Sequence, residues 1–463
     1  MSRAWVVAER GIIVVDSAAP PPEEQDVVIA VEAAQLPWAH LSPSAEVPGW
    51  AAVGRVVAAG ERALALLDQR VLVGAIDPCG QCETCRRGGG TVCPLARRRG
   101  DGNRGTLAER ITVAARWVVP LAELGLDASE ARAGADGSAN GDADPDADRD
   151  ADRGALPPLH DSGELASDAP EDALDEAHAP ALGELPRDPD DGSSSHVTDA
   201  TAPRPARLGA AGALAVLAGE AALAYTAYAR SDLAPKEPVV VLGRTPVTRF
   251  LVEILLAKGI TPVVVVQPPT TPRGPHASDA QPSAQDGDDA TFFAWTAWLA
   301  ARGAGVATVT GVTMPSPGEQ ALAAARSAIA LVLARAAPAS ASPSPGATAL
   351  SGRPWRIVAT DPASLSLAAA LAGPRATITA VCAAAQGLVA GDGGFGAALW
   401  QREVSVIGVA AASPELILET AALAARGQLD LQAGVVVREV GSLGESRQLA
   451  QDPTCALVLT LPA

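Results

Sequence analysis

The stretch DPCGQCETCRRGGGTVCP, residues 77–94, holds four of the six cysteines of the chain. They are Cys79, Cys82, Cys85 and Cys93, in the spacing C-x2-C-x2-C-x7-C. Thiolates this close in sequence can surround one zinc ion in a tetrahedral site. Because four protein ligands leave no open coordination position, such an ion holds a loop and does no chemistry. The stretch therefore predicts one structural zinc ion per chain.

Two disulfides are the alternative for the same four cysteines. The chain begins MSRAWVVAERG, which lacks the pattern of a secretory signal peptide. Thiols inside a cell stay reduced. We therefore expect zinc at these thiols and a cytoplasmic location for the protein. The two other cysteines, Cys382 and Cys455, stand in apolar surroundings and are expected in the core.

The negative charge of the chain is concentrated in one segment. Residues 127–200 hold 21 acidic residues and 4 arginines, a balance of −17, so the net charge of −18 leaves −1 for the rest. The remainder is nearly neutral and has no basic patch of the kind that nucleic acid needs. We therefore expect no nucleic-acid partner.

Residues 121–207 are expected to form an acidic disordered insertion. They are rich in Asp, Ala, Pro, Gly and Ser, and they cannot bury enough apolar surface to offset the entropy lost on ordering. The alternating aspartates from Asp142 to Asp152 suggest a calcium loop as an alternative. The bend glycine and the closing glutamate of such a loop are missing, so a solvated linker is favoured.

The residue patterns on either side of this insertion indicate two kinds of domain. Residues 1–120 contain short apolar runs bounded by turn residues, such as VVIAVEAA, which are typical of β-strands. Over residues 208–400, strand-like runs such as EPVVVLGR alternate with helix-like runs such as TRFLVEILLAKG. This alternation indicates a parallel sheet with helices on both faces. The expected fold class is α/β, a β domain plus a doubly wound sheet of the Rossmann type.

The most apolar stretch, Leu208–Ala229, is long enough to span a membrane. It consists mostly of alanine and glycine, and Glu220 stands in its middle. Alanine contributes little to membrane insertion, and a central acid opposes it. We therefore expect a buried helix and no membrane partner.

These features, in this order, resemble the medium-chain dehydrogenase/reductase family, the zinc-containing alcohol dehydrogenases. VPGWAAVGRVVAAG is similar to the family's VPGHE segment, the four cysteines follow at its structural-zinc spacing, and LWQREVSVIGVAAASPELILET is similar to its C-terminal return. The resemblance implies a GroES-like catalytic domain (1–120), a Rossmann dinucleotide-binding domain (208–400) and a return segment (401–463) that completes the first domain. It also implies NAD or NADP, a small-molecule substrate, and a homodimer or homotetramer.

The sequence departs from the family at the catalytic zinc. Pro37 stands where the family has its first cysteine ligand, and Trp50 and Ala51 replace its His-Glu pair. Ala222 stands where the third ligand usually falls. An open zinc site needs about three side-chain ligands. We therefore expect no catalytic metal, and a pocket filled with apolar bulk.

Two titratable residues stand near these replaced positions. Glu220 precedes Ala222 by two residues, so a shift of register would bring it closer to the third-ligand position. His40 occupies a position at which the resemblance places an Asp or His, three residues after the missing cysteine. One histidine and one glutamate do not bind a catalytic zinc.

The dinucleotide fingerprint G-x-G-x-x-G is also altered. Its glycines allow a tight turn, close approach to the pyrophosphate and close packing of helix on strand. Here the first glycine is Gly243, Thr245 and Thr248 replace the others, and Pro246 lies near the expected helix start. A Cβ at Thr245 would push the pyrophosphate outward, although its hydroxyl can donate to a phosphate.

The residues around this fingerprint form the predicted cofactor site. Arg244 and Arg249 offer positive charge, but exposed surface arginines are the favoured interpretation. Gln267 replaces the acid that would hydrogen-bond the ribose of NAD, so the choice between NAD and NADP stays open. The predicted cofactor-binding residues are Gly243, Arg244, Thr245, Val247 and Gln267.

Three functional hypotheses follow. The first is an alcohol dehydrogenase-like oxidoreductase that uses NAD(P) without a catalytic zinc, as the resemblance implies for the quinone and enoyl reductase branches. Its proton donor would be His40, Tyr225, Tyr228 or water, although a tyrosine on an alanine-rich helix usually belongs to the core. The second is a pseudoenzyme that keeps the dehydrogenase fold for binding or assembly. The third, an ordinary zinc alcohol dehydrogenase, requires ligands that the sequence lacks.

Overall fold

The computed structural model describes most of the two expected domains. The described residues are 2–8, 11–36, 46–100, 105–124, 211–233, 237, 239–268, 284–310, 318–336, 355–381, 399, 401–432, 434–440 and 454–461. All of them belong to one compact unit, Met1–Gly134 with Pro203–Ala463. The predictions for Pro37, His40, Cys382 and the acidic insertion, including its calcium alternative, fall outside the described residues except at 121–124.

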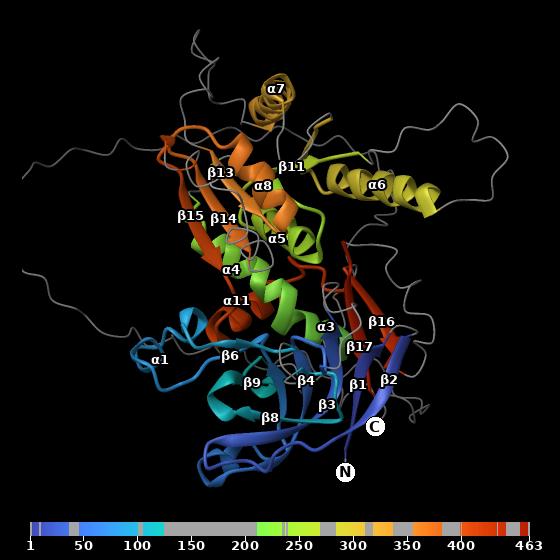
Figure 1. Cartoon of the computed structure of the whole chain (residues 1–463), viewed down its shortest axis with the longest axis vertical. Helices are drawn as coiled ribbons and strands as arrows, with labels where there is room; N and C mark the ends of the chain where they lie inside the picture. Colours follow the sequence, from blue (N-terminus) through green and yellow to red (C-terminus); the bar gives the residue numbers. More distant parts are fainter. Residues whose placement is uncertain are drawn as a thin grey trace, which may run out of the picture. The chain divides into compact units, whose positions relative to one another are not determined.

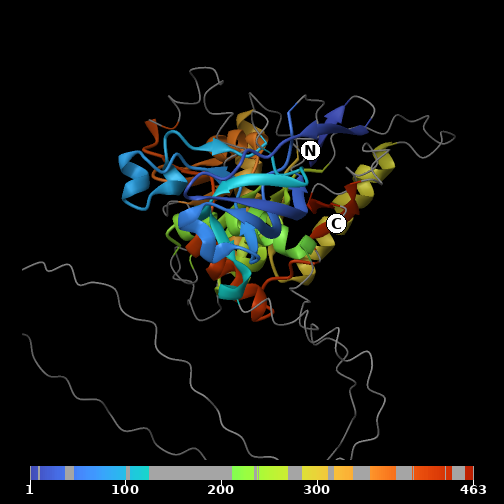
Figure 2. The same ribbon diagram turned by 90° about the horizontal axis from the view of Figure 1, so that it is seen from below.

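The first domain is built on a seven-stranded sheet in the order β16-β17-β3-β4-β5-β9, with β8 also paired to β3. Its strands are β3 (Asp26–Leu36), β4 (Ala52–Ala59), β5 (Arg70–Val73), β8 (Arg110–Ala114), β9 (Val118–Pro120), β16 (Val435–Glu439) and β17 (Ala456–Thr460). The two C-terminal strands lie beside the early strands in both views (Figures 1 and 2). Val27, Ile29 and Val31 of β3 alternate into the core because successive strand residues point to opposite faces.

Short elements surround this sheet. An antiparallel hairpin pairs β1 (Ser2–Ala8) with β2 (Gly11–Ser17), and a second two-stranded ribbon pairs β6 (Ile76–Asp77) with β7 (Arg97–Arg98). The thiol-rich segment lies between β6 and β7. The remaining short helices of this domain are η2 (Glu61–Leu66), α1 (Glu83–Arg86), η3 (Gly90–Val92), η4 (Ala115–Trp117) and η5 (Leu121–Leu124).

The second domain is built on a six-stranded parallel sheet in the order β12-β11-β10-β13-β14-β15. Its strands are β10 (Val239–Leu242), β11 (Pro262–Val266), β12 (Gly305–Thr308), β13 (Arg356–Ala359), β14 (Thr377–Val381) and β15 (Ser405–Val409). Its helices are α5 (Pro246–Ala257), α6 (Ala284–Ala301), α7 (Glu319–Ala336), α8 (Pro362–Leu371) and α11 (Pro414–Ala425). The strand order reverses between β10 and β13, which makes the carboxyl ends of these two strands the switch point of the sheet.

Helices cover both faces of this sheet. Val239 and Val241 of β10 belong to a hydrophobic cluster with residues of α5 and α6. Val240 and Leu242, which point the other way, belong to a cluster with residues of α7 and α8. The predicted α/β class, a β domain plus a doubly wound sheet of the Rossmann type, is therefore confirmed.

One predicted boundary is wrong. Residues from 401 onward were expected to return to the first domain, but β15 pairs in parallel with β14 and extends the second sheet. The run SVIGV is apolar enough to add an edge strand before the chain leaves. The return is made later, when β17 pairs with β3.

The apolar stretch near residue 220 forms a single long helix with an irregular middle. It consists of α3 (Ala211–Val216), a π-helical turn at Leu217–Ala221 and α4 (Ala222–Arg230). Among the described residues this is the one helix long and apolar enough to cross a membrane, and 89% of its most apolar window is buried inside the protein. It therefore serves as a core helix, packed against both sheets.

Candidate functional site

The four predicted zinc ligands lie together. Their sulfurs are all within 4.8 Å of one another, and the Sγ–Sγ distances include 3.6 Å for Cys79–Cys93, 3.8 Å for Cys82–Cys93 and 4.0 Å for Cys79–Cys85. A tetrahedral zinc with Zn–S distances of about 2.3 Å needs sulfurs about 3.8 Å apart. The cluster therefore fits a structural zinc. All four cysteines are free, which excludes the disulfide alternative in this structure.

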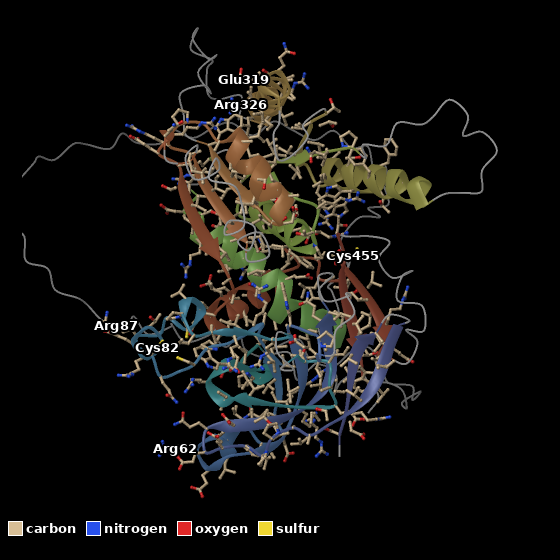
Figure 3. All side chains as sticks on the ribbon, in the orientation of Figure 1. Arg62, Cys82, Arg87, Glu319, Arg326 and Cys455 are labelled. Atoms are coloured by element: carbon tan, nitrogen blue, oxygen red, sulfur yellow. The ribbon has the colours of Figure 1, made fainter. Side chains whose placement is uncertain are left out.

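The local backbone turns these sulfurs toward one point. The N–H of Cys82 donates to Cys79 Sγ at 3.4 Å, and the N–H of Cys85 donates to Cys82 Sγ at 3.4 Å, where Cys82 caps α1. N–H donation from Gln81 and then Cys82 lowers the pKa of Cys79 to about 6, whereas burial raises the pKa of Cys85 to about 12. Figure 3 shows Cys82 and the exposed Arg87 on the segment between β6 and β7, which we name the sulfur lobe.

The region in which the resemblance places the family's catalytic zinc is closed in this structure. Trp50 is 7% exposed, Ala51 and Ala222 are fully buried, and the guanidinium of Arg98 lies over the Trp50 ring, 5.4 Å from its centroid. A cavity of about 10 Å³ is left here. That volume holds about one water molecule. Its lining residues are Trp50, Ala75, Arg98, Ala218, Gly219, Leu223, Ala410, Ala411 and Ala412.

These residues do not fit a catalytic zinc. Among the described residues, the four cysteines are the only group of three or more Cys, His, Asp or Glu whose ligand atoms could hold a metal ion. The side chains that line the small cavity offer a cation and an indole but no metal ligand. The absence of a catalytic metal stays a prediction, because Pro37 and His40 lie outside the described residues.

Glu220 sits behind this cavity and does not line it. It is 5% exposed and accepts a short hydrogen bond from Nε2 of Gln35, a fully buried residue of β3. Burial raises the pKa of Glu220 to about 8. The pair meets at the π-helical turn, where a Cβ on Gly219 would lie 1.6 Å from Gln35 Oε1, so a larger residue there would displace the Gln35 side chain. Glu220 therefore holds the helix to β3, and it belongs to no candidate metal-binding group among the described residues.

The candidate proton donors on α4, Tyr225 and Tyr228, bond and pack within the core. The hydroxyl of Tyr225 donates to Glu419 of α11 at 2.5 Å, and burial raises its pKa. Lys258 Nζ lies 5.4 Å from the Tyr225 ring centroid and 5.7 Å from that of Tyr228. Neither tyrosine lines either of the two cavities. Both pack among α4, α5 and α11 as core residues, so the catalytic prediction for Tyr228 gains no support.

A larger cavity of about 210 Å³ lies at the carboxyl ends of β10, β11 and β13. Three of the five predicted cofactor residues line it, namely Gly243, Arg244 and Gln267. Thr245 and Val247 do not line it: Thr245 is the N-cap of α5, and Val247, in its first turn, is buried in the core. Gly243 has a φ of +116°, a conformation that side-chain-bearing residues rarely adopt.

Four further lining residues with aromatic or polar side chains were missed by the sequence reasoning: Phe292, Trp295, Asp361 and Ser364. The first two come from α6, which is joined to β11 by a long connection, so their distance in sequence hid them. The other two belong to the run D-P-A-S, which opens α8 after β13 as T-P-V-T opens α5 after β10. That repeated pattern at two neighbouring strand ends is a signal that could have identified them.

The start of α5 uses its own side chains as caps. The N–H of Thr248 donates to Thr245 Oγ1 at 3.2 Å, and the N–H of Thr245 donates to Thr248 Oγ1 at 3.3 Å. Pro246, at the first helical position, has no N–H. The residues present therefore fit the nucleoside half of a dinucleotide, but they leave few donors for its pyrophosphate.

Arg249, expected at the surface, is buried. It is 8% exposed, its guanidinium lies 4.6 Å from the Trp298 ring centroid, and Nη1 approaches Cys455 Sγ at 3.7 Å. Cys455, labelled in Figure 3, is buried as predicted. The aromatic ring next to α5 explains the difference, because arginine stacks on indole at low exposure.

Comparison with known proteins gives a domain match and a shared fold. The model of the alcohol dehydrogenase GroES-like domain matches residues 23–123. The fold is shared with a short chain alcohol dehydrogenase from E. coli CFT073 complexed with NADH (13% identity, 99% of both chains, TM-score 0.54). It is also shared with a cobalt and zinc bound thermostable alcohol dehydrogenase from Pyrobaculum aerophilum (14% identity, 99% of both chains, TM-score 0.55). A third example is galactitol-1-phosphate dehydrogenase from Escherichia coli (14% identity, 99% of this chain and 100% of that chain, TM-score 0.56). No curated protein matches by sequence.

Proposed function

We propose that this chain is an oxidoreductase that binds NAD(P) weakly and works without a catalytic zinc. The proposal is supported by its GroES-like domain and by the fold that it shares with zinc-type alcohol dehydrogenases. The cavity at the switch point of the parallel sheet carries this proposal, because open α/β sheets bind their ligands there. The sulfur cluster holds a zinc ion for architecture only.

Different residues of the cavity lining would contact different parts of the cofactor. Phe292 and Trp295 offer aromatic faces to a base, and Gln267 stands at the end of β11, where a ribose hydroxyl would be bound. Gly243 and Arg244 face the phosphate side. When bound, NAD(P) supplies the hydride chemistry. A small-molecule substrate follows from this proposal, with its proton taken from water or from His40.

A pseudoenzyme is the second candidate, and one observation favours it. The described part of the catalytic cleft has room for about one water molecule between Trp50 and the Ala410–Ala412 segment. A substrate would need the cleft to open before it could meet a cofactor. If the cleft never opens, the fold serves binding or assembly.

Assembly through the edge of the parallel sheet belongs to the same proposal. β15 is an edge strand, and Val406 on it is 37% exposed. Exposed edge strands offer unpaired backbone groups to a second copy. Light scattering on the purified protein distinguishes a homodimer or homotetramer from a monomer.

Titration with NADH and with NADPH, followed by nucleotide fluorescence, tests the proposed function. We expect saturable binding of at least one of them, weaker than micromolar, with adenosine as a competitor. Absence of binding by both at millimolar concentration would exclude the oxidoreductase and leave the pseudoenzyme.

A further inference from the structure

The carboxylate of Asp361 lies against the loop that joins β10 to α5. It caps α8 by accepting the N–H of Ser364 at 2.7 Å, and the backbone N–H groups of Ala363 and Arg244 also donate to it. A Cβ built on Gly243 would lie 2.5 Å from its Oδ2 atom. The loop expected to bind a pyrophosphate therefore already binds an anion of the protein itself.

The remaining donors of the loop are mostly used as well. The N–H groups of Thr245 and Thr248 donate to each other's hydroxyls, and Pro246 has no N–H. With the N–H of Arg244 donated to Asp361, the backbone N–H groups of Arg244, Thr245 and Thr248 are all used within the protein. A helix N-terminus attracts phosphate only through unsatisfied N–H groups. This one has been largely satisfied internally.

The other side of the cavity suits an uncharged heterocycle with hydroxyl groups. Phe292 and Trp295 line it, and Trp295 is 3% exposed with no hydrogen-bond partner for Nε1 among the described residues. Gln267 offers both a donor and an acceptor. The volume of about 210 Å³ is smaller than typical drug-sized pockets and suits one nucleoside better than a dinucleotide.

We propose that Asp361 is a specificity-determining residue of this cavity: its carboxylate takes the N–H of Arg244 that a ligand phosphate would otherwise bind. The cavity therefore holds a nucleoside moiety and gains little from the phosphates attached to it. This inference rests on the proposed function for the location of the cofactor, and it explains why that binding is weak.

Calorimetric titration of the full-length protein with adenosine and with ADP tests this inference. In the wild-type chain we expect similar affinities for the two ligands. In Asp361→Asn, which keeps a good cap for α8, ADP should gain about tenfold or more, as for one charge-assisted hydrogen bond, while adenosine stays unchanged. Asp361→Ser, a shorter cap that cannot reach the loop, should show the same gain.

A matched control removes one negative charge elsewhere. Asp232 is exposed, has a φ of 47° and does not line the cavity, and asparagine tolerates that backbone conformation. Asp232→Asn should leave both affinities unchanged. An equal gain in this control would assign the effect to net charge and overturn the proposal.

Two other results would also overturn it. One is a ratio of ADP to adenosine affinity that is the same in the wild type and both Asp361 variants. The other is the failure of adenosine to bind any variant at millimolar concentration. NADH binding with an unchanged ratio would leave the proposed function standing and remove the role of Asp361. A changed ratio without NADH binding to any variant would support the role of Asp361 and exclude the proposed function.

Discussion

The guanidinium of Arg98 lies over the indole ring of Trp50, with Cζ 5.4 Å from the ring centroid. Trp50 stands where the resemblance places a ligand of the catalytic zinc, so a cation–π pair occupies the place of a metal centre. Arg98 comes from the ribbon strand β7 that closes the sulfur lobe. This side-chain contact therefore links the lobe to the closed cleft.

This contact makes Trp50 a structural residue. Because Trp50 is 7% exposed, Trp50→Ala should lower the free energy of unfolding by about 3–5 kcal/mol, the usual cost of removing a buried large aromatic residue. Urea denaturation measures this loss. Phe293, which is 67% exposed, provides the control, and its change to alanine should cost little. An unchanged urea midpoint in Trp50→Ala would show that the ring does not pack in the cleft.

Loss of one thiol should disrupt the sulfur lobe. Cys82 caps α1 and approaches Cys93 at 3.8 Å, so Cys82→Ser removes a zinc ligand. We expect this variant to lose its zinc and to have a lower melting temperature than the wild type. A chelator should not lower the melting temperature of this variant any further. Cys455→Ser, far from the lobe, should keep its zinc. A Cys82→Ser protein that melts like the wild type would contradict the structural role.

Glu220 should make stability depend on pH. Its pKa is raised from the model-compound value of 4.5 to about 8 by burial, so the folded state holds a proton that the unfolded state has already released between these values. The free energy of unfolding therefore falls as pH rises from about 5 to 8. Thermal melts across this range measure the fall.

The variant Glu220→Gln isolates this contribution. The amide keeps an acceptor for Gln35 Nε2 and cannot ionise. The melting temperature of the variant should therefore fall less than that of the wild type over the same pH range. Glu253, whose pKa is raised to about 7 mainly by burial, keeps its own smaller dependence in both proteins. Identical pH profiles for wild type and variant would show that Glu220 is not buried as described.

Cofactor preference should depend on Gln267. It lines the cavity at the end of β11, where an acid would bind the ribose hydroxyl of NAD and repel the phosphate of NADP. We expect Gln267→Asp to weaken NADPH relative to NADH by about tenfold or more, measured by nucleotide fluorescence. Gln267→Asn is the neutral control. A ratio that stays constant would place the ribose elsewhere.

The sequence predicted best where local chemistry alone decides the structure. The spacing of the cysteines from Cys79 to Cys93 predicted a cluster. They converge because short-range contacts, such as the cap that Cys82 forms on α1, turn the backbone locally. The alternation of strands and helices predicted the sheet, since apolar periodicity is also local. The family resemblance, which places a zinc ligand at the position of Trp50, predicted a pocket filled with apolar bulk, and Trp50 is buried.

Features that depend on long-range packing could not be predicted. Arg249 was expected at the surface, but its burial depends on Trp298 of α6, almost fifty residues later. Asp361 went unnoticed because only the sheet brings β13 beside β10. β15 was assigned to the return segment because its pairing with β14 is set by the sheet edge and not by its own residues.

We propose above that this chain keeps an architectural zinc ion and works without a catalytic one. The number of zinc ions per chain, measured by elemental analysis for the wild type and for Cys82→Ser after dialysis, distinguishes these two sites. We expect about one zinc ion in the wild type and none in the variant, since one tetrahedral site takes one ion. Two ions in the wild type, or one retained by the variant, would contradict the claim.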